Sequence, residues 1–470
     1  MIERLFKLSE NKTTVRTEIL AGLTTFLTMA YIIFVQPAVL SGKMFGMDTG
    51  IDFGAVTTAT CLSAALATAI MAVYARYPIA QAPGMGENFF FVFSALPAAT
   101  AAGFTNGWQV ALGVVFVSGV LFLILPLIGL RELIFNSVSP SMKNGIAAGI
   151  GLFIAFIGLQ QAGIIIKDPA SAVKLSTHFA SPDLIVFFLG LLTTAVLHAR
   201  RIRGSILWGI VVATALACLL KVALPQMPAV SAAHDVTTSM LNTRFELART
   251  LMALPPSLGP TFMKMDVAHA LTAKMLPFVF VFLFMLTFDA IGTLIGVCEQ
   301  AGFMRDNKLP RAKQAMVSDA IGTVAGAALG TSTVTSFIES AAGVEAGGRT
   351  ELTGLIVAAL FLVALFFSPL IAMIGGYPPI TAPALTIVGA MMMQNVNKIE
   401  WKDYTESIPA FLIIIGIPLS YSIADGLALG FISYALIRAF SGRAREISWL
   451  TYTLAIVLVF YFLFVRSRMA

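Results

Sequence analysis

Residues 331–344 read TSTVTSFIESAAGV, and residues 78–97 read PIAQAPGMGENFFFVFSALP. Both stretches are apolar enough to be buried, yet glycine, polar residues and, in 78–97, proline interrupt their hydrophobic pattern. Irregular backbone survives inside a membrane only where it is buried in protein or lines a cavity. If the flanking chain spans a membrane, these two segments predict two broken elements beside a functional cavity.

The composition of the chain indicates that the flanking segments do span a membrane. Of the 470 residues, 58% are hydrophobic and 11% are charged, whereas a soluble domain has about 25% charged residues. The net charge of +6 comes from basic residues in short gaps between apolar runs, a bias that sets membrane topology. We therefore predict an all-α polytopic protein of the lipid bilayer, with no nucleic-acid partner.

The apolar runs give the number of membrane elements. A spanning helix needs roughly 20 apolar residues. Clear candidates lie near 19–40, 54–74, 107–130, 145–166, 183–199, 205–224, 275–298, 351–374, 380–396, 408–424 and 425–440. With the two interrupted segments and a short Gly/Ala-rich run at 316–330, the chain has about fourteen elements.

The order of these elements suggests an internal repeat. Each half has an interrupted segment third in order, and each half ends with a pair of short spans. Seven elements per half is an odd number, so the second half must be inverted relative to the first. Inverted repeats with broken helices at matched positions are typical of secondary transporters.

Basic residues predict the orientation. The N-terminus and the gaps at 200–203, 305–313 and 438–445 are basic, so we expect them on the cytoplasmic side of the cell (inner or plasma) membrane. The more polar gap at 225–272 reads as an external loop joining the halves. The apolar run at 447–465 is expected to lie in the membrane interface, because the two arginines after it would otherwise be outside.

Two acidic residues lie at membrane depth. Asp289 sits inside FVFVFLFMLTFDAIGTLIGV (278–297), and Glu339 follows several hydroxyl residues in the second interrupted segment. An ionisable group there costs at least about 2.5–3.5 kcal/mol, so it marks a functional site by default. The alternative for Asp289 is a structural pairing with a neighbouring helix.

Other candidates flank these acids. Asn88 offers a donor and an acceptor, which suits the edge of a heterocycle, and Glu87 precedes it. Asp319 could brace the second interrupted segment. Phe89 and Phe288 could stack on a flat ring, although facing lipid is the simpler role for each of them.

The residues also limit the mechanism. The four histidines lie at span ends or in loops, so a symported proton would bind Asp289 or Glu339, whose burial disfavours the charged form. No GxxxxGK[ST] loop, TVGYG-like filter or HExxH motif occurs, and the three cysteines lack metal-ligand spacing. We expect no cofactor and no metal, and neither an ATP-driven pump nor an enzyme.

At these residues the chain resembles the AzgA-like purine permeases of the nucleobase:cation symporter-2 (xanthine/uracil permease) superfamily. The likeness runs from about residue 15 to 445. It is carried by AGLTTFLTMAYIIFVQP (21–37), QAPGMGENFFF (81–91), FDAIGTLIGV (288–297) and TSFIESAAGVEAGGRTELTG (335–354).

The resemblance implies two inverted repeats of seven elements, with a short strand in each of the broken elements 3 and 10. It implies a core domain (1–130 and 273–376), a gate domain (131–224 and 377–442), an external loop (225–272) and a C-terminal hydrophobic segment (443–470). Substrate would bind between elements 3 and 10, and one domain would move against the other in elevator-type alternating access.

The resemblance also assigns residues. Asp289 occupies the place of the substrate-binding acid in element 8, Glu339 that of the acid in element 10, and Asn88 the polar position in element 3. The remaining expected substrate contacts are Phe288, Phe89, Thr293 and Ser336. The expected supporting residues are Asp319, Glu87 and Thr28.

The implied function is proton-coupled import of adenine, guanine or hypoxanthine, and a homodimer is compatible with it. The GMGE form of the element 3 motif leaves a xanthine/uracil-type permease as an alternative. A second alternative is an anion transporter or channel of the same fold. That alternative requires a basic group at the site, and none is visible within a span.

Overall fold

The computed structural model describes residues 6–128, 138–169, 172–227, 234–300, 303, 309–460 and 462–463. Within these residues the chain is mostly helical. Eight helical segments are long and apolar enough to cross a membrane, and two shorter apolar helices follow at Tyr404–Ser420 and Trp449–Phe460. A polytopic all-α architecture was predicted from composition, and the described helices confirm it.

The first half of the chain contains nine α-helices in its described part. They are α2 (Val15–Met29), α3 (Ile32–Leu40), α4 (Phe53–Ile70), α5 (Met85–Phe90), α6 (Leu96–Ala101), α7 (Gly107–Ile128), α9 (Pro140–Gln161), α10 (Pro182–Ala199) and α11 (Ser205–Ala223). Two π-helical segments, η2 (Met71–Ala75) and η3 (Phe91–Ala95), extend α4 and α5, and 3-10 turns lie at η1 (Lys43–Phe45) and η4 (Leu224–Gln226).

Three short helices follow in the connection between the halves: α13 (His234–Thr237), α14 (Met240–Thr243) and α15 (Val267–Ala270). The longer helices of the second half are α16 (Leu276–Gln300), α17 (Ala312–Leu329), α18 (Ser340–Glu345), α19 (Glu351–Ala364), α20 (Ser368–Gly375), α21 (Pro378–Met392), α22 (Tyr404–Ser420), α23 (Ile423–Phe440) and α24 (Trp449–Phe460). The 3-10 turns are η5 (Leu365–Phe367), η6 (Met393–Lys398) and η7 (Ala444–Glu446).

The two interrupted segments meet as a two-stranded antiparallel sheet. Strand β1 (Gln81–Pro83) pairs with β4 (Val334–Ser336), so that Gln81 lies opposite Ser336 and Ala82 opposite Thr335. This pairing gives hydrogen-bond partners to backbone N–H and C=O groups that a broken helix would leave unpaired in an apolar interior. The expectation of a short strand in each interrupted segment is confirmed.

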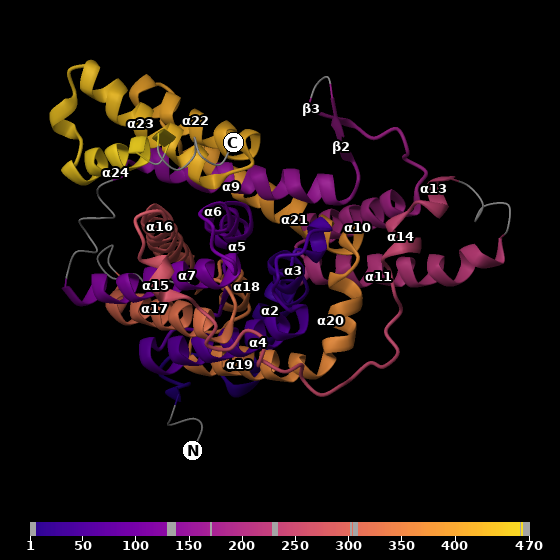
Figure 1. Cartoon of the computed structure of the whole chain (residues 1–470). Coiled ribbons are helices and arrows are strands. Elements are labelled where there is room, and N and C mark those ends of the chain that lie inside the picture. Colours follow the sequence, from indigo (N-terminus) through magenta and orange to yellow (C-terminus); the bar gives the residue numbers. More distant parts are fainter. Residues whose placement is uncertain are drawn as a thin grey trace.

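A short helix follows each strand directly. Helix α5 begins two residues after β1, and α18 begins four residues after β4. Figure 1 shows both near the middle of the molecule, between α9 and α22 on one side and α4, α17 and α19 on the other. The strands therefore place Glu87, Asn88 and Glu339 close to the centre of the fold.

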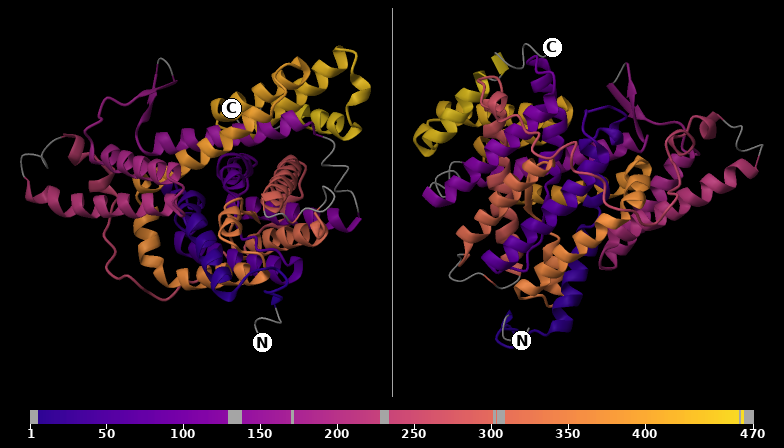
Figure 2. Two further views of the ribbon diagram at one scale, coloured as in Figure 1. Left: turned by 180° about the vertical axis from the view of Figure 1, so that it is seen from behind. Right: turned by 60° about the horizontal axis from the view of Figure 1, so that its bottom comes forward.

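The helices form two groups by mutual contact (Figures 1 and 2). In one group α2, α4, α7, α16, α17 and α19 pack together, with α3 against α4 and α18 against α2. In the other, α9 packs against α21 and α22, α22 against α23, and α10 against α11 and α21. Contacts between the groups include those of α5 with α9, α2 with α11, and α20 with α21.

Two elements differ from the sequence expectations, and one expected element begins four residues earlier than predicted. The run at 316–330 belongs to α17, a continuous helix of 18 residues, because its small residues allow close packing: a Cβ on Gly322 would lie 2.8 Å from Ala67 Cβ. The span at 351–374 is instead bent at η5. A second hairpin, β2 (Ile165–Asp168) with β3 (Ala172–Leu175), projects from the helices and was not expected.

The C-terminal apolar segment packs on the second group. Helix α24 contacts α23, and its buried side chains, including Leu454 and Leu458, lie on one face. These contacts leave open whether the segment crosses the bilayer, so its interfacial placement stays a prediction. The last residues of the predicted 447–465 run lie outside the described residues.

An ion-pair network connects three helices at one end of the second group. Arg438 of α23 donates to Glu406 of α22 over 2.5 Å, and Ser139, which caps α9, donates to the other Glu406 oxygen over 2.5 Å. Arg443 bonds Asp403, at the start of α22, over 2.7 Å. Three helices of this group are thereby tied together at one end.

The contact between Arg443 and Asp403 in this network predicts that the stability of the fold depends on pH. A hydrogen bond from Thr405, and the Arg443 guanidinium beside it, lower the pKa of Asp403 to about 2. Because the folded-state pKa lies below the ordinary value of 3.8, the contact stabilises the fold above about pH 4 and is lost as the pH falls toward 2. We expect Asp403→Asn to lower the melting temperature at pH 7 but not near pH 2. Equal losses at both pH values would contradict a charge-dependent contact.

Candidate functional site

The site is built where the crossing strands face α16. Asp289, in the middle of α16, interacts through its carboxylate with the Thr335 hydroxyl of β4. It lies within electrostatic reach of three other acids, Glu87, Asp319 and Glu339. The two acids singled out from sequence therefore lie in one region of the fold and not on opposite faces.

The surroundings of Asp289 leave room beside it. The carboxylate lies deep among protein atoms, but its side chain is exposed. Gly292, one turn further along α16, is also exposed, and a Cβ added there would meet no heavy atom of the described chain within 4 Å. Thr293 beside it is half-buried. Asp289 therefore borders open space while protein surrounds its other sides.

Glu339 is held by the first helices of the chain. The Tyr31 hydroxyl, between α2 and α3, donates to Glu339 Oε1 over 2.9 Å. Thr28 donates to the main-chain oxygen of Glu339 over 3.4 Å and to the Thr25 carbonyl over 2.7 Å. Tyr31 thus orients the Glu339 carboxylate, and Thr28 bonds its backbone.

Glu87 is a buried acid at the start of α5, with 3% of its surface exposed. Its Oε2 atom lies over Gly84, where an added Cβ would approach it to 2.4 Å and Thr335 Oγ1 to 3.2 Å. Any larger residue at position 84 would require the Glu87 carboxylate to move. The side chain therefore lies next to Thr335, on the Asp289 side of the strand crossing.

Asn88 is fully buried, and its amide is already engaged. Its Nδ2 donates to Gln36 of α3, and its Oδ1 accepts from Ser332. Gln36 in turn donates to Thr331 Oγ1 over 2.8 Å and to Ser332 over 3.1 Å. In this structure Asn88 ties the two broken elements to α3, so a bound ligand would reach its amide only by displacing one of these partners.

Ser336 and Asp319 lie on the other face of β4. Ser336 Oγ donates to Asp319 Oδ1 over 2.8 Å, and Gln81 of β1 donates to the same carboxylate. Both Ser336 and Asp319 are buried. The structure thus places Asp319 as a brace behind the strands, while Ser336 faces Asp319 and not the open space.

The two aromatic candidates, Phe89 and Phe288, differ in what the structure describes of them. Phe89 is fully buried and packs against Phe45, Phe93 and Phe153, with ring centroids 6.0–6.2 Å apart. The side chain of Phe288 lies outside the described residues. The structure therefore gives Phe89 a packing contact with α9, through Phe153, and leaves ring stacking by either residue a prediction.

Four residues of the site were not singled out from sequence: Tyr31, Gln36, Gln81 and Thr335. Gln36 is a lone amide inside the apolar helix IIFVQPAVL, and Gln81 opens the first strand. A polar side chain in an apolar run was the available signal for both. Tyr31 had no such signal, because a tyrosine within a membrane helix is unremarkable in sequence.

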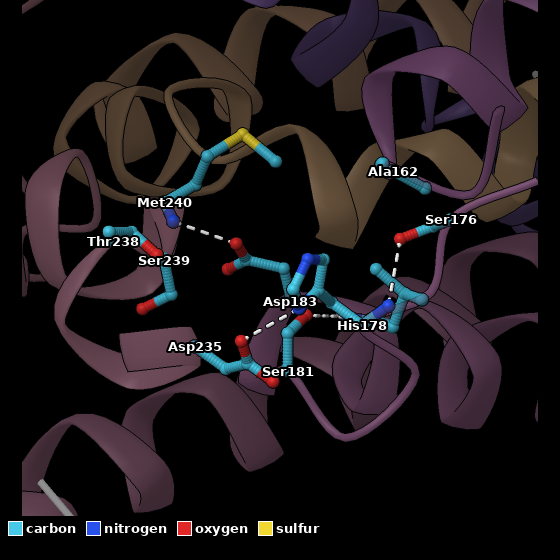
Figure 3. Close-up of a pocket in the computed structure, with 11 residues that line it drawn as sticks. Ala162, Ser176, His178, Ser181, Asp183, Asp235, Thr238, Ser239 and Met240 are labelled. Atoms are coloured by element: carbon cyan, nitrogen blue, oxygen red, sulfur yellow. Dashed lines mark hydrogen bonds and ion pairs between the residues drawn. The ribbon is translucent and has the colours of Figure 1, made fainter. Parts of the chain in front are cut away.

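Two cavities lie away from this region. One, of about 180 Å³, is lined by Asp183, His178 and Asp235 among others (Figure 3), and Asp183 accepts from the Met240 and Leu241 amides there. The other, of about 680 Å³, is lined by Lys43, Arg244 and parts of α20. Neither includes Asp289 or Glu339. In the described part of the chain, no three His, Cys, Asp or Glu side chains gather as a metal site would require.

The fold and the site together define a class, the polytopic membrane proteins with two broken elements that cross near the middle of the fold. The chain is similar in fold to the transmembrane domain of the cyanobacterial bicarbonate transporter BicA (TM-score 0.58, 16% identity, 88% of this chain and 97% of that one). It is similar to murine Slc26a9 in the inward-facing state as well (TM-score 0.58, 12% identity, 90% and 68%).

The sequence places the chain within this class. Residues 16–429 match the model of the permease family Xan_ur_permease, and the chain belongs to this family. It is 41% identical to the guanine/hypoxanthine permease PbuG of Bacillus subtilis over 99% of this chain and all of that one. It is 38% identical to the adenine permease AdeP of Escherichia coli over 100% and 97%. The chain is thus an integral membrane permease and not an enzyme.

Proposed function

We propose that this chain is a secondary active transporter that imports purine nucleobases together with protons. The carrying observation is that Asp289 and Glu339, from two separate elements, lie within electrostatic reach of each other beside open space. The named activities of PbuG and AdeP support a purine as the cargo.

The two acids suit the donors of a purine. Guanine, hypoxanthine and adenine all present N–H groups, and a carboxylate accepts such hydrogen bonds strongly. Leaving either acid unpaired near a dry interior is costly, so binding of the base and of a proton would occur together. Because no histidine lies mid-span, we assign the transported proton to Asp289 or Glu339.

An inorganic anion fits this site poorly. The relatives in fold include a bicarbonate transporter, so an anion was a reasonable alternative. Three acids, from α5, α17 and the β4–α18 segment, each lie within electrostatic reach of Asp289 of α16. No ion pair of a basic side chain with any of them is recorded among the described residues. An anion would meet the negative charge of Asp289 or Glu339 with no cation to offset it.

We assign fourteen membrane elements in two inverted repeats. The first seven are α2–α3, α4, β1–α6, α7, α9, α10 and α11, and the second seven are α16, α17, β4–α18, α19–α20, α21, α22 and α23. The final pairs support the assignment, because glycine brings both into close contact. A Cβ on Gly209 of α11 would lie 1.8 Å from Thr194 of α10, and one on Gly430 of α23 would lie 2.1 Å from Ile413 of α22.

We assign the first helix group to a core domain and the second to a gate domain that moves against it. The core would comprise 1–130 and 273–376, and the gate 131–224 and 377–442, with 225–272 as the connecting loop. The division follows the packing of the helices, since α16, α17 and α18 belong to the first group while α9 of the second group contacts α5.

The contacts of α16 suggest which side of the site is open. Toward the start of α16, Phe284 lies near Phe431 of α23, with ring centroids 6.3 Å apart. Phe93 of η3 also packs on Tyr421, at the end of α22, with ring centroids 5.1 Å apart. Among the described residues, no heavy atom lies within 4 Å of a Cβ added at Gly292, toward the end of α16. We place the N-terminus and the basic gaps on the cytoplasmic side of the inner or plasma membrane. With that orientation, the open side of the site faces the cytoplasm.

The outer surface of the gate group fits a lipid environment. Leu192 of α10 and Leu219 and Val222 of α11 are more than half exposed, which is unfavourable in water and favourable against lipid. A homodimer would cover part of such a surface. Mass measurement of the protein in lipid nanodiscs would give the number of copies.

Uptake of labelled bases tests the proposal. We expect cells that lack their own purine permeases to accumulate guanine, hypoxanthine or adenine when they express this chain. A protonophore should abolish accumulation, and unlabelled uracil or bicarbonate should compete poorly. Accumulation that survives the protonophore would refute proton coupling, and uptake of bicarbonate without purine uptake would favour the anion alternative.

The Tyr31 contact predicts a smaller effect at the same site. Removing the hydroxyl in Tyr31→Phe deletes the donor to Glu339, and a hydrogen bond to a charged group contributes about 1.5–3 kcal/mol. Because the substrate can still pair with Glu339, we expect uptake to fall about three- to tenfold at low substrate concentration. Thr25→Ser, in the neighbouring helix α2, is the control, and unchanged uptake by Tyr31→Phe would show that Tyr31 does not orient Glu339.

A further inference from the structure

A second polar cluster lies behind the crossing strands, on the side away from the open space. Asp319 of α17 and Gln81 of β1 are both fully buried, with 0% of their surface exposed. Gln81 is the register partner of Ser336 on β4. The three side chains therefore form a sealed group that touches both strands at once.

Two buried oxygen atoms of this group have no hydrogen-bond partner among the described residues. Gln81 Nε2 and Ser336 Oγ both donate to Asp319 Oδ1. Asp319 Oδ2 and Gln81 Oε1 have no partner among the described residues. Both leftover atoms are acceptors when the acid is charged, and both belong to the two planar groups that already share one hydrogen bond.

A single proton would satisfy both atoms. A protonated carboxyl has one O–H donor and one acceptor oxygen, and a primary amide has N–H donors and one acceptor oxygen. A proton on Asp319 Oδ2 could therefore be donated to Gln81 Oε1 while Gln81 Nε2 continues to donate to Oδ1. The result is a cyclic acid–amide pair that leaves neither oxygen bare, which matters because a buried unpaired polar atom is costly.

The charges around Asp319 favour the same form. Helix α17 is packed by α4, η2, α7, α16 and both strands. The charged group from these elements that acts on Asp319 is Asp289, another acid. Among the described residues no Lys, Arg or His side chain forms an ion pair with Asp319. A buried carboxylate without a cation is strongly disfavoured relative to its neutral acid.

We propose that Asp319 is a resident proton-binding site whose neutral carboxyl pairs with Gln81 and holds β1 against β4 behind the substrate site. Its role is positioning. Side chains alternate along a strand, so Ser336 faces Asp319 while Thr335 faces Asp289. A neutral Asp319 fixes Thr335 beside Asp289 without adding a further negative charge to the site.

Infrared spectroscopy tests the proton directly. A protonated carboxyl has a C=O stretch distinct from the bands of a carboxylate, and the difference spectrum of the wild-type protein and Asp319→Asn isolates the contribution of this residue. We expect the wild type at pH 7 to show a protonated-carboxyl band that Asp319→Asn lacks. A difference spectrum that shows only carboxylate bands would overturn the proposal.

Substrate binding tests the positioning role. Asparagine reproduces the neutral acid, because its Oδ1 can accept from Gln81 Nε2 and its Nδ2 can donate to Gln81 Oε1. We expect purified Asp319→Asn to bind a purine within about twofold of the wild-type affinity, and Asp319→Leu, which offers neither group, to bind at least about tenfold more weakly. Loss of binding by folded Asp319→Asn would show that the charge is required and would overturn the proposal.

This binding experiment rests on the proposed function, whereas the infrared experiment does not. If the wild-type protein failed to bind purines, the proposed cargo would be wrong, and the carboxyl band would still decide the state of Asp319. Gln81→Leu provides a matched control in the spectrum. It removes the amide partner and should shift the Asp319 band, and an unshifted band would contradict the acid–amide pair.

Discussion

Asp289→Asn and Glu339→Gln are each expected to lower purine uptake by at least about tenfold. Both replacements keep the shape of the side chain and remove its negative charge. A hydrogen bond to a charged acceptor contributes about 1.5–3 kcal/mol, and about 1.4 kcal/mol corresponds to a factor of ten in affinity. Each amide also loses the ability to bind and release a proton, so accumulation against a gradient should disappear as well.

The comparison needs a control for expression and folding. Glu246→Gln removes a carboxylate from an exposed loop residue and should leave uptake unchanged. The amounts of each variant in the membrane are compared by immunoblotting, and initial rates are measured at low base concentration. Normal uptake by both Asp289→Asn and Glu339→Gln would remove the assigned binding site, even if the chain still carried purines.

The double variant adds information about the arrangement. Since the two acids act on each other in the structure, their effects on binding should not be additive. If one base bridges both side chains, the loss in Asp289→Asn/Glu339→Gln should be smaller than the product of the single losses. Strictly multiplicative losses would indicate that the acids contact different parts of the substrate independently.

Arg438→Ala is expected to destabilise the fold by about 3–5 kcal/mol. Arg438 and Glu406 form a buried pair over 2.5 Å, with side chains about one-tenth exposed. Removal of one partner of a buried pair leaves an uncompensated charge, which carries a penalty of this size. Thermal unfolding in detergent, followed by tryptophan fluorescence, measures the change as a lower melting temperature.

A second replacement separates charge from packing. Arg438→Met/Glu406→Gln removes both charges and keeps much of the volume, so it should regain a large part of the stability lost in Arg438→Ala. The partner Glu446 is half exposed, and Glu446→Gln should have little effect. A double variant no more stable than Arg438→Ala would mean that the helices are joined by shape and not by the ion pair.

Much of the architecture could be predicted from the chain itself. The interrupted segments at 78–97 and 331–344 predicted two broken elements, the family resemblance implied a short strand in each, and the structure has β1 and β4 there. The Gly/Ala-rich run at 316–330 was counted as a membrane element, and the structure has the 18-residue helix α17 there, beginning at Ala312. Its stability comes from close packing against α4 and α7, which no local pattern reveals.

The candidate site was predicted in part. Asp289 and Glu339 were identifiable because acids inside apolar runs are costly and therefore rare. The partners of Glu339 and Asn88 were not, because Tyr31 and Gln36 lie about 300 and 50 residues away along the chain. Asn88 carried the expected polar chemistry, but its amide proves to be engaged by Gln36 and Ser332.

Composition and hydrophobic pattern alone determined that this chain lives in lipid, where its helices lie and which acids are out of place there. Those properties depend on the solvent preference of each residue and on short-range periodicity, so they can be read locally. Only the tertiary structure decided that the two broken segments pair as strands, that Asp289 faces Thr335 on one side of β4, and that Asp319 is sealed with Gln81 on the other. Such contacts join residues hundreds of positions apart, and their geometry is set by packing that no single segment contains.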